Sequence, residues 1–65
     1  MRIYEVTFDG REKDSEEWDS NWERENVCVE DGGAVEAIEL ATKQVRIGSD
    51  FQIRAASVKV LAEAP

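Results

Sequence analysis

Carboxylates are the side chains that could carry chemistry in this sequence, because it holds 15 Asp and Glu residues and no histidine. Paired carboxylates perform the chemistry of glycoside hydrolases and bind the metal ions of metal-dependent hydrolases. Such enzymes need apolar surroundings that desolvate one of the two carboxylates. Here the acids gather in a charged segment with few apolar neighbours. We therefore expect no catalytic residue and no enzymatic activity.

Other reactive or ligand-binding groups are also missing from the sequence. Without histidine, no Ser-His-Asp or Cys-His arrangement can form, and Cys28 has acidic neighbours rather than cationic ones. A calcium loop that starts at Asp19 would need glycine where Arg24 stands. Gly32-Gly33 is not followed by the lysine of a phosphate-binding loop. The sequence predicts no metal site and no cofactor.

The negative charge is concentrated in one segment. Eight Lys and Arg residues face the 15 acids, which gives a net charge of −7. Positions 9 to 31 hold three bases and ten acids, namely Asp9, Glu12, Asp14, Glu16, Glu17, Asp19, Glu23, Glu25, Glu30 and Asp31. Acids and bases elsewhere cancel. The segment favours a basic partner surface over nucleic acid or an anionic membrane, unless it is simply a solubilising loop.

Two tryptophans, Trp18 and Trp22, stand four residues apart in this acidic stretch. Tryptophan in a charged setting is typical of binding hot spots. The alternative is that one or both pack over the end of the core and pin the loop. If the segment binds a partner, we expect the contacts to come from Glu16, Glu17, Trp18, Asp19, Trp22, Glu23, Glu25, Glu30, Asp31, Glu36 and Arg54.

The element around which these residues must be arranged is a helix over Ala34 to Ile47. At about 100° per residue its apolar residues share one face, and most of them are alanines, so the helix should lie close to whatever it covers. Asp31 is expected to cap the start of this helix. Gly48 is expected to supply the left-handed residue that ends it.

Three strand patterns flank the helix. Ile3 to Phe8 alternates apolar and polar residues, a second strand should lie within Trp22 to Glu30, and a third covers Phe51 to Leu61. In the third strand, Phe51 and Ile53 have the opposite parity to Val58 and Val60. A β-bulge at Ala55-Ala56 would bring all four onto the face under the helix.

These elements predict one small α+β domain over residues 1–65 with the order β-β-α-β. The first two strands form an antiparallel hairpin, and a right-handed crossover through the helix places the third strand beside the first. The result is a three-stranded antiparallel sheet of order 3-1-2 with one helix on one face. Residues 9–21 are expected to form an acidic loop or hairpin tip, and residues 62–65 a frayed tail.

One sheet face is left without a helix in this arrangement. It should present Glu5, Thr7, Trp22, Arg24, Cys28, Gln52, Arg54 and Lys59. The second and third strands are open edges. A partner could add to either the face or an edge, and a homodimer through an edge is one such arrangement.

The stretch from Glu25 to Lys43, followed by Phe51-Gln-Ile-Arg and Val58-Lys-Val, resembles a type of small phage protein. In that type a strand ends in acids, a helix rich in Ala, Ile and Leu follows, and a last strand closes the sheet. The T7 phage inhibitor of host RNA polymerase is similar in length, acidity and element order. The resemblance covers residues 25 to 65, and a weaker similarity extends to Ile3 to Phe8.

The resemblance implies non-catalytic occlusion of a polymerase through an acidic strip and through arginines on the last strand. The residues that match the acidic strip in kind are Glu25, Glu30, Asp31, Glu36 and Glu39. In a gapless placement Ala55 and Ser57 stand where the arginines would be, and Arg54 is one position away.

The single cysteine permits no internal disulfide, and no stretch approaches the roughly 18 apolar residues of a membrane helix. The start of the chain lacks the apolar core of a secretory signal. These features predict a soluble cytoplasmic protein, in the host cell if it is encoded by a phage.

We expect a non-enzymatic, acidic, phage-type protein that binds and modulates a host protein with a basic surface, for example as an inhibitor of a nucleic-acid-binding enzyme such as RNA polymerase. Two alternatives stay open. A DNA mimic would block a restriction or repair factor, but it needs its carboxylates on a rigid element rather than a loop. A small structural or assembly protein would pair into homodimers through a sheet edge.

Overall fold

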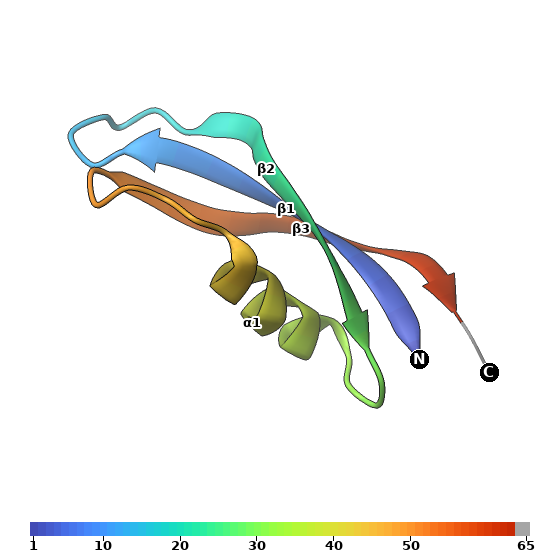
Figure 1. Ribbon diagram of the computed structural model, residues 1–65. Coiled ribbons are helices and arrows are strands. Elements are labelled where there is room, and N and C mark those ends of the chain that lie inside the picture. Colours follow the sequence, from blue (N-terminus) through green and yellow to red (C-terminus); the bar gives the residue numbers. More distant parts are fainter. Residues whose placement is uncertain (64–65) are drawn as a thin grey trace.

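The chain folds into three strands and one helix, shown in Figure 1 as a computed structural model that describes residues 1–63. The order is β1 (Arg2–Glu12), β2 (Asp19–Val29), α1 (Ala34–Gln44) and β3 (Phe51–Glu63). The strands form one antiparallel sheet of order β2-β1-β3, and α1 lies on one of its faces. The predicted α+β class, element order and sheet order are confirmed.

The core lies where the alternation of β1 meets the helix. Tyr4, Val6 and Phe8 are 4%, 0% and 1% exposed. On β2, Val27, which lies opposite Tyr4, and Val29, which lies opposite Arg2, are also buried. Since residues two apart in a strand share a face, the period-2 pattern alone directs these side chains toward α1. We call this face the helix side of the sheet and the opposite one the far face.

The predicted bulge in β3 is present. Thr7 lies opposite Ser57, but Phe8 lies opposite Ala55, so Ala56 is the extra residue. The bulge changes the parity of β3, and Ile53 and Val58 therefore both lie on the helix side, packed against the core. A second shift between Ile3 and Tyr4 makes Leu61 another extra residue.

The helix packs close to the sheet through small side chains. Ala37 and Ala41 are both 0% exposed, and Ile38, Leu40 and Val45 pack around them against the core. Alanine at the contact lets the helix backbone approach the sheet, as the apolar face of the sequence predicts.

The helix begins at Ala34 as predicted, but it ends at Gln44 instead of Ile47, and neither predicted cap is present. Asp31 does not cap it, because the N-cap is Gly33 and no side chain caps the first turn. Gly48 does not end it either, because α1 stops at Gln44, Val45 is extended, and no described glycine has a positive φ.

The early end of the helix has a geometric reason. The last strand must start opposite Glu12, at the far end of β1. The 11 residues of β1 span about 36 Å, whereas the 11 helical residues of α1 return only about 16 Å. Residues 45–48, which belong to no helix or strand, therefore cover the remaining distance, and a turn in which the Phe51 N–H donates to the Gly48 carbonyl leads into β3. This segment is visible as the long connection in Figure 1.

The strands are longer than the apolar pattern predicts. β1 continues to Glu12 and β2 starts at Asp19, so much of the predicted 9–21 loop is strand and the connection is residues 13–18. At the other end, β3 continues to Glu63, which includes part of the predicted tail; positions 64 and 65 of that tail lie outside the described residues. The molecule is elongated, with extents of 45 × 18 × 14 Å.

Candidate functional site

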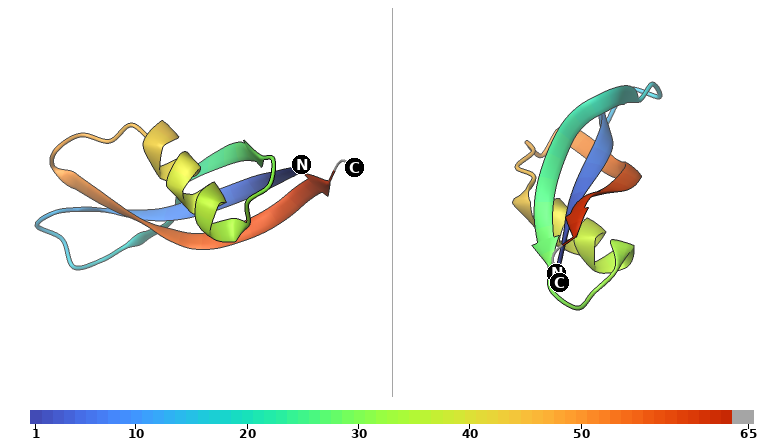
Figure 2. Two further views of the ribbon diagram at one scale, coloured as in Figure 1. Left: turned by 90° about the horizontal axis from the view of Figure 1, so that it is seen from below. Right: turned by 90° about the vertical axis from the view of Figure 1, so that its right-hand side faces the viewer.

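The hairpin end of the sheet extends beyond the helix. Seen from the helix side, α1 covers the half of the sheet nearer the termini, and the tip of the β1–β2 hairpin projects past it (Figure 2, left). The helix covers neither face of this half. Polar residues such as Arg11 and Glu12 can therefore occupy strand positions here without being buried beneath it. The candidate site lies on this projecting half.

Trp22 lies on the helix side of the sheet, which corrects its predicted place on the far face. A side chain added at Gly10 would come within 2.6 Å of the Trp22 ring, so the indole covers the position that a Cβ would occupy. The predicted parity fails because β2 is irregular there: Phe8 lies opposite Glu23 and Gly10 opposite Asp19. Asn21, with φ 54°, takes the left-handed conformation that this irregularity needs.

An aromatic pair results from this placement. The rings of Trp22 and Phe51 stack with their centroids 6.2 Å apart and their planes at 27°. Both residues are half-buried. This contact joins the start of β3 to β2 across the buried Gly10 of β1, so Trp22 does pack beyond the end of the core.

The Gly10 contact gives a stability prediction. Replacing Gly10 with alanine should lower the free energy of unfolding by about 1–3 kcal/mol, because the new methyl group must displace the indole from a packed position. Urea denaturation followed by tryptophan fluorescence measures the loss. Gly48→Ala is the matched control, because its added Cβ would lie 3.7 Å from the Phe51 ring, an ordinary van der Waals distance, and it should change stability by less than about 0.5 kcal/mol. Equal midpoints for both variants would contradict the packing described here.

Charge is sorted between the two faces of the sheet. Cross-strand partners share a face, so the register places four acids on the helix side of the hairpin half, namely Glu12, Asp19, Glu23 and Glu25. Among the strand residues described within positions 1–63, the basic residue on the helix side is Arg2, and it lies at the opposite end of the sheet from these acids. The far face instead carries four bases, Arg11, Arg24, Arg54 and Lys59, against two acids, Glu5 and Asp9.

Trp18 belongs to the far face, where two arginines hold it. The guanidinium carbons of Arg11 and Arg54 lie 4.7 and 4.2 Å from the centre of its ring. Arg54 also forms an ion pair with Asp9 at 3.4 Å, and Arg11 donates two hydrogen bonds to the Gln52 side chain. These contacts fold the tip of the hairpin against the far face, so Trp18 is already engaged within the chain.

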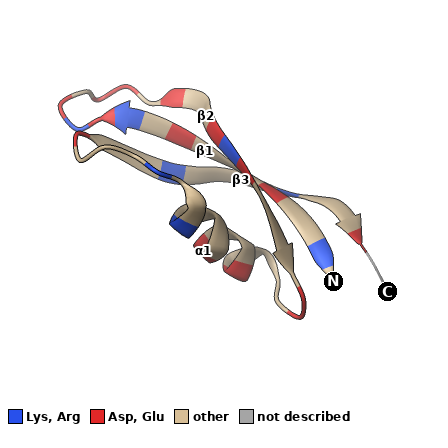
Figure 3. Ribbon diagram, viewed as in Figure 1, with Lys and Arg blue, Asp and Glu red and all other residues tan. Residues whose placement is uncertain are grey.

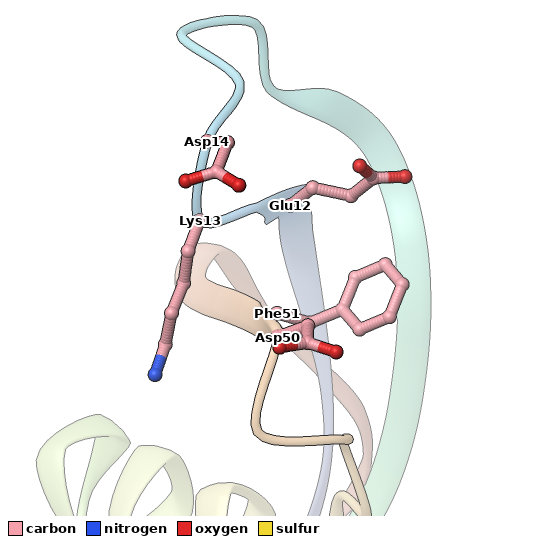
Figure 4. Close-up of a pocket in the computed structure, with 5 residues that line it drawn as sticks. All are labelled: Glu12, Lys13, Asp14, Asp50 and Phe51. Atoms are coloured by element: carbon pink, nitrogen blue, oxygen red, sulfur yellow. The ribbon is translucent and has the colours of Figure 1, made fainter.

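A cavity opens between the hairpin tip and the start of β3. It has a volume of about 520 Å³ and is lined by Glu12, Lys13, Asp14, Asp50 and Phe51. The backbone N–H of Lys13 donates to the carbonyl of Asp50 at 2.8 Å, which ties the tip to β3. Figure 4 shows the Glu12 carboxylate and the Phe51 ring on the side of β2, with Lys13 extending the other way.

The predicted contact residues do not form one patch. Glu16, Glu17, Trp18, Asp19, Trp22, Glu23 and Glu25 belong to the hairpin tip and β2, whereas Glu30, Asp31 and Glu36 lie where β2 passes into α1. Arg54 lies on the far face of β3. The acidic segment is drawn out along the molecule rather than gathered at one corner (Figure 3).

At the end of the sheet near the termini, the charges pair with each other. Arg2 donates to the Tyr4 hydroxyl at 3.4 Å and forms an ion pair with Glu63. The hydrogen bond to Tyr4 and the attraction of Glu63 raise the pKa of the Arg2 guanidinium above its ordinary value. Arginine is cationic at neutral pH in any case, so this shift does not create a titrating group there.

Both outer strands keep an unpaired edge among the described residues, but neither is a flat edge. β2 carries the Asn21 irregularity and its acids, and β3 carries bulges at Ala56 and Leu61 together with Lys59. Bulges and charged side chains are devices by which proteins discourage edge pairing. The geometry therefore favours a side-chain surface over an edge as the candidate site.

Three contributors to the hairpin-end surface, Gly10, Glu12 and Phe51, were not among the predicted contact residues. The sequence pattern predicts Phe51 on the face under the helix, and Gly10 falls within the predicted 9–21 loop. A glycine inside an otherwise regular strand is a signal for the close approach of another group, and it could have pointed to Trp22.

Comparison of the chain with protein-family models, with curated proteins and with solved structures found no match. Within residues 1–63 there is no helix long and apolar enough to cross a membrane. Nor do these residues contain a cluster of three or more Cys, Asp and Glu side chains placed to hold a metal ion.

Proposed function

We propose that this chain is a non-enzymatic binding protein that docks on a basic surface of a partner protein and modulates that partner. In keeping with the phage-type resemblance, the partner would be a host protein, and a nucleic-acid-binding enzyme such as RNA polymerase is the leading example. Enzymes of that kind present basic surfaces to their nucleic acids, and an acidic protein can occupy such a surface.

The observation that supports this proposal is the sorting of charge between the two sheet faces. The helix side of the hairpin half carries Glu12, Asp19, Glu23 and Glu25, while most bases of the strands lie on the far face. The strand arginines other than Arg2 lie on the far face, so the acidic side can meet a basic surface without repulsion from them. Electrostatic complementarity of this kind steers association and selects partners.

The proposed docking can be tested by affinity capture. Immobilised protein should retain a basic protein from a bacterial lysate at about 0.05 M salt and release it at about 0.5 M, because screening shortens the range of surface charges. A Trp22→Ala variant should retain less, because that substitution removes half of the aromatic pair. Failure to retain any protein at low salt, or retention that salt does not alter, would refute the proposal.

A DNA mimic is the alternative on which the structure bears most directly. It requires carboxylates on a rigid element, and β2 now provides one, since Asp19, Glu23 and Glu25 lie on a strand rather than a loop. The density of charge along β2, however, argues against a DNA mimic. The 11 residues of β2 advance about 36 Å, over which one DNA strand carries about 11 phosphates, and Arg24 interrupts the three acids. Docking on a protein surface fits this sparse charge better.

A further inference from the structure

We infer that the hairpin end of the helix side receives an arginine side chain from a basic segment of the partner. This inference rests on the proposed function and adds the chemistry of the group that the site binds. It is carried by three features that adjoin each other: an aromatic pair, a rim of carboxylates and an open cavity.

The aromatic pair provides a surface on which a flat cation can stack. Trp22 and Phe51 are stacked on each other at 6.2 Å, and both are half-buried. Because α1 stops at Gln44, the helix does not extend over them as it does over the core (Figure 2). Cations are attracted to the faces of such rings, and to tryptophan most strongly.

The rim places carboxylates beside that surface. Glu12 lies directly opposite Phe51 in the sheet, and Asp19 lies directly opposite Gly10, which the Trp22 ring covers. A guanidinium is planar and has donors that match a carboxylate in a two-point contact, so it can stack on a ring and pair with an acid at once. The ammonium of lysine is a point charge that lacks this match.

The cavity gives the side chain room to enter. Its volume of about 520 Å³ lies against Phe51, and Glu12, Asp14 and Asp50 line it. Lys13 also lines it, but that side chain extends away from the side on which the Glu12 carboxylate and the Phe51 ring lie (Figure 4). The part of the cavity next to the ring is therefore acidic.

Charge complementarity selects a separate basic protein as the occupant rather than a second copy of this chain. The chain's own Arg11 and Arg54 are engaged by Trp18, Gln52 and Asp9 on the far face. A second copy would have to break these contacts to offer Arg11 or Arg54, and its exposed Arg24 and Arg46 belong to a molecule of the same negative net charge. Two copies, each with a net charge of −7, would also repel one another.

The test compares a hexa-arginine peptide with a hexa-lysine peptide of equal charge. The arginine peptide should bind about two- to fivefold more tightly at low salt, because its side chains add stacking to the shared attraction. In NMR spectra the indole N–H signal of Trp22 should move on titration while that of Trp18 stays in place, since the two lie on opposite faces.

Matched variants separate the site from general acidity. Glu12→Gln and Glu39→Gln each remove one negative charge from an exposed position, but Glu39 lies on α1 rather than at the hairpin end. Glu12→Gln should weaken the arginine peptide about threefold and Glu39→Gln by less than twofold. Phe51→Leu keeps an apolar side chain but removes the ring, so the preference for arginine should shrink while binding of the lysine peptide persists.

The outcomes distinguish this inference from the proposed function. Equal affinity for both peptides, with equal losses in the two glutamine variants, would overturn the arginine site and leave docking on a basic surface intact. A signal change at Trp18 instead of Trp22 would overturn it as well. Absence of binding by either peptide at low salt would count against both proposals. Sedimentation of the chain alone as a dimer would assign the surface to a second copy and overturn the inference.

Discussion

A Phe8→Ala variant should be largely unfolded at room temperature. Phe8 is 1% exposed in the middle of β1, and it and Val6 are the largest side chains that are completely buried within the described part of the chain. Truncating a buried phenylalanine costs about 3–5 kcal/mol, because the transfer energy is lost and a cavity remains. A domain of this size has about 3–5 kcal/mol of stability from its core in total. The two quantities are equal within their spread, so little folded population should survive.

Circular dichroism and urea denaturation measure this effect. The wild-type chain should show a cooperative transition, and the Phe8→Ala chain should lack a folded baseline. Val35→Ala is the matched control, because Val35 is 72% exposed on α1 and its truncation should change stability by less than about 0.5 kcal/mol. A folded Phe8→Ala protein with a midpoint near that of the wild type would show that the core does not depend on this ring.

The fold could be predicted where the buried residues recur at the regular spacing of a strand or a helix. The alternation of Tyr4, Val6 and Phe8 indicates one buried strand face, and the alanines at 37 and 41 indicate a close-packed helix. The bulge at Ala56 could be predicted because the apolar residues of β3 change parity partway along the strand, and one extra residue keeps all of them on the same face. In each case the core itself imposes the pattern.

The projecting half of the sheet could not be predicted in this way, because no core covers it. There the strands run through polar residues, so the hydrophobic pattern ends before the strands do. The end of α1 is likewise set by the distance that the chain must travel back to Glu12, rather than by Gly48. The spacing of apolar residues therefore indicates neither where the strands end nor where α1 ends.

The orientation of the tryptophans depends on contacts that are distant in sequence or on a single dihedral angle. Trp22 reaches the helix side because Asn21 is left-handed and β2 advances four residues while β1 advances two. Trp18 is held by Arg11 and by Arg54, which comes from the last strand. Trp18 and Trp22 stand only four residues apart in the sequence, but the structure places them on opposite faces.

Reversing three acids at the hairpin end should abolish partner capture. The triple variant Glu12→Lys, Asp19→Lys and Glu23→Lys replaces three of the four carboxylates on the helix side of that half. Each reversal turns an attraction to a basic surface into a repulsion, and like charges across an interface cost several kcal/mol. We expect affinity to fall about 100-fold or more, which a retention assay at low salt would register as complete loss.

The matched control reverses the three predicted contact acids at the other end of the molecule. The triple variant Glu30→Lys, Asp31→Lys and Glu36→Lys makes the same change in net charge, from −7 to −1, in the turn before α1 and its first turn. It weakens long-range attraction equally but leaves the hairpin end intact. Its affinity should fall about tenfold, through the association rate.

The ranking of the two triple variants decides which surface docks. The phage-type resemblance assigns the acidic strip in part to Glu30, Asp31 and Glu36, whereas the sorting of charge and the aromatic pair assign it to the hairpin end. Circular dichroism must first show that both variants are folded. Equal losses would then mean that net charge alone governs binding. A larger loss for the Glu30, Asp31 and Glu36 variant would move the docking surface to the start of α1, because the hairpin end would retain its acids in the variant that fails to bind.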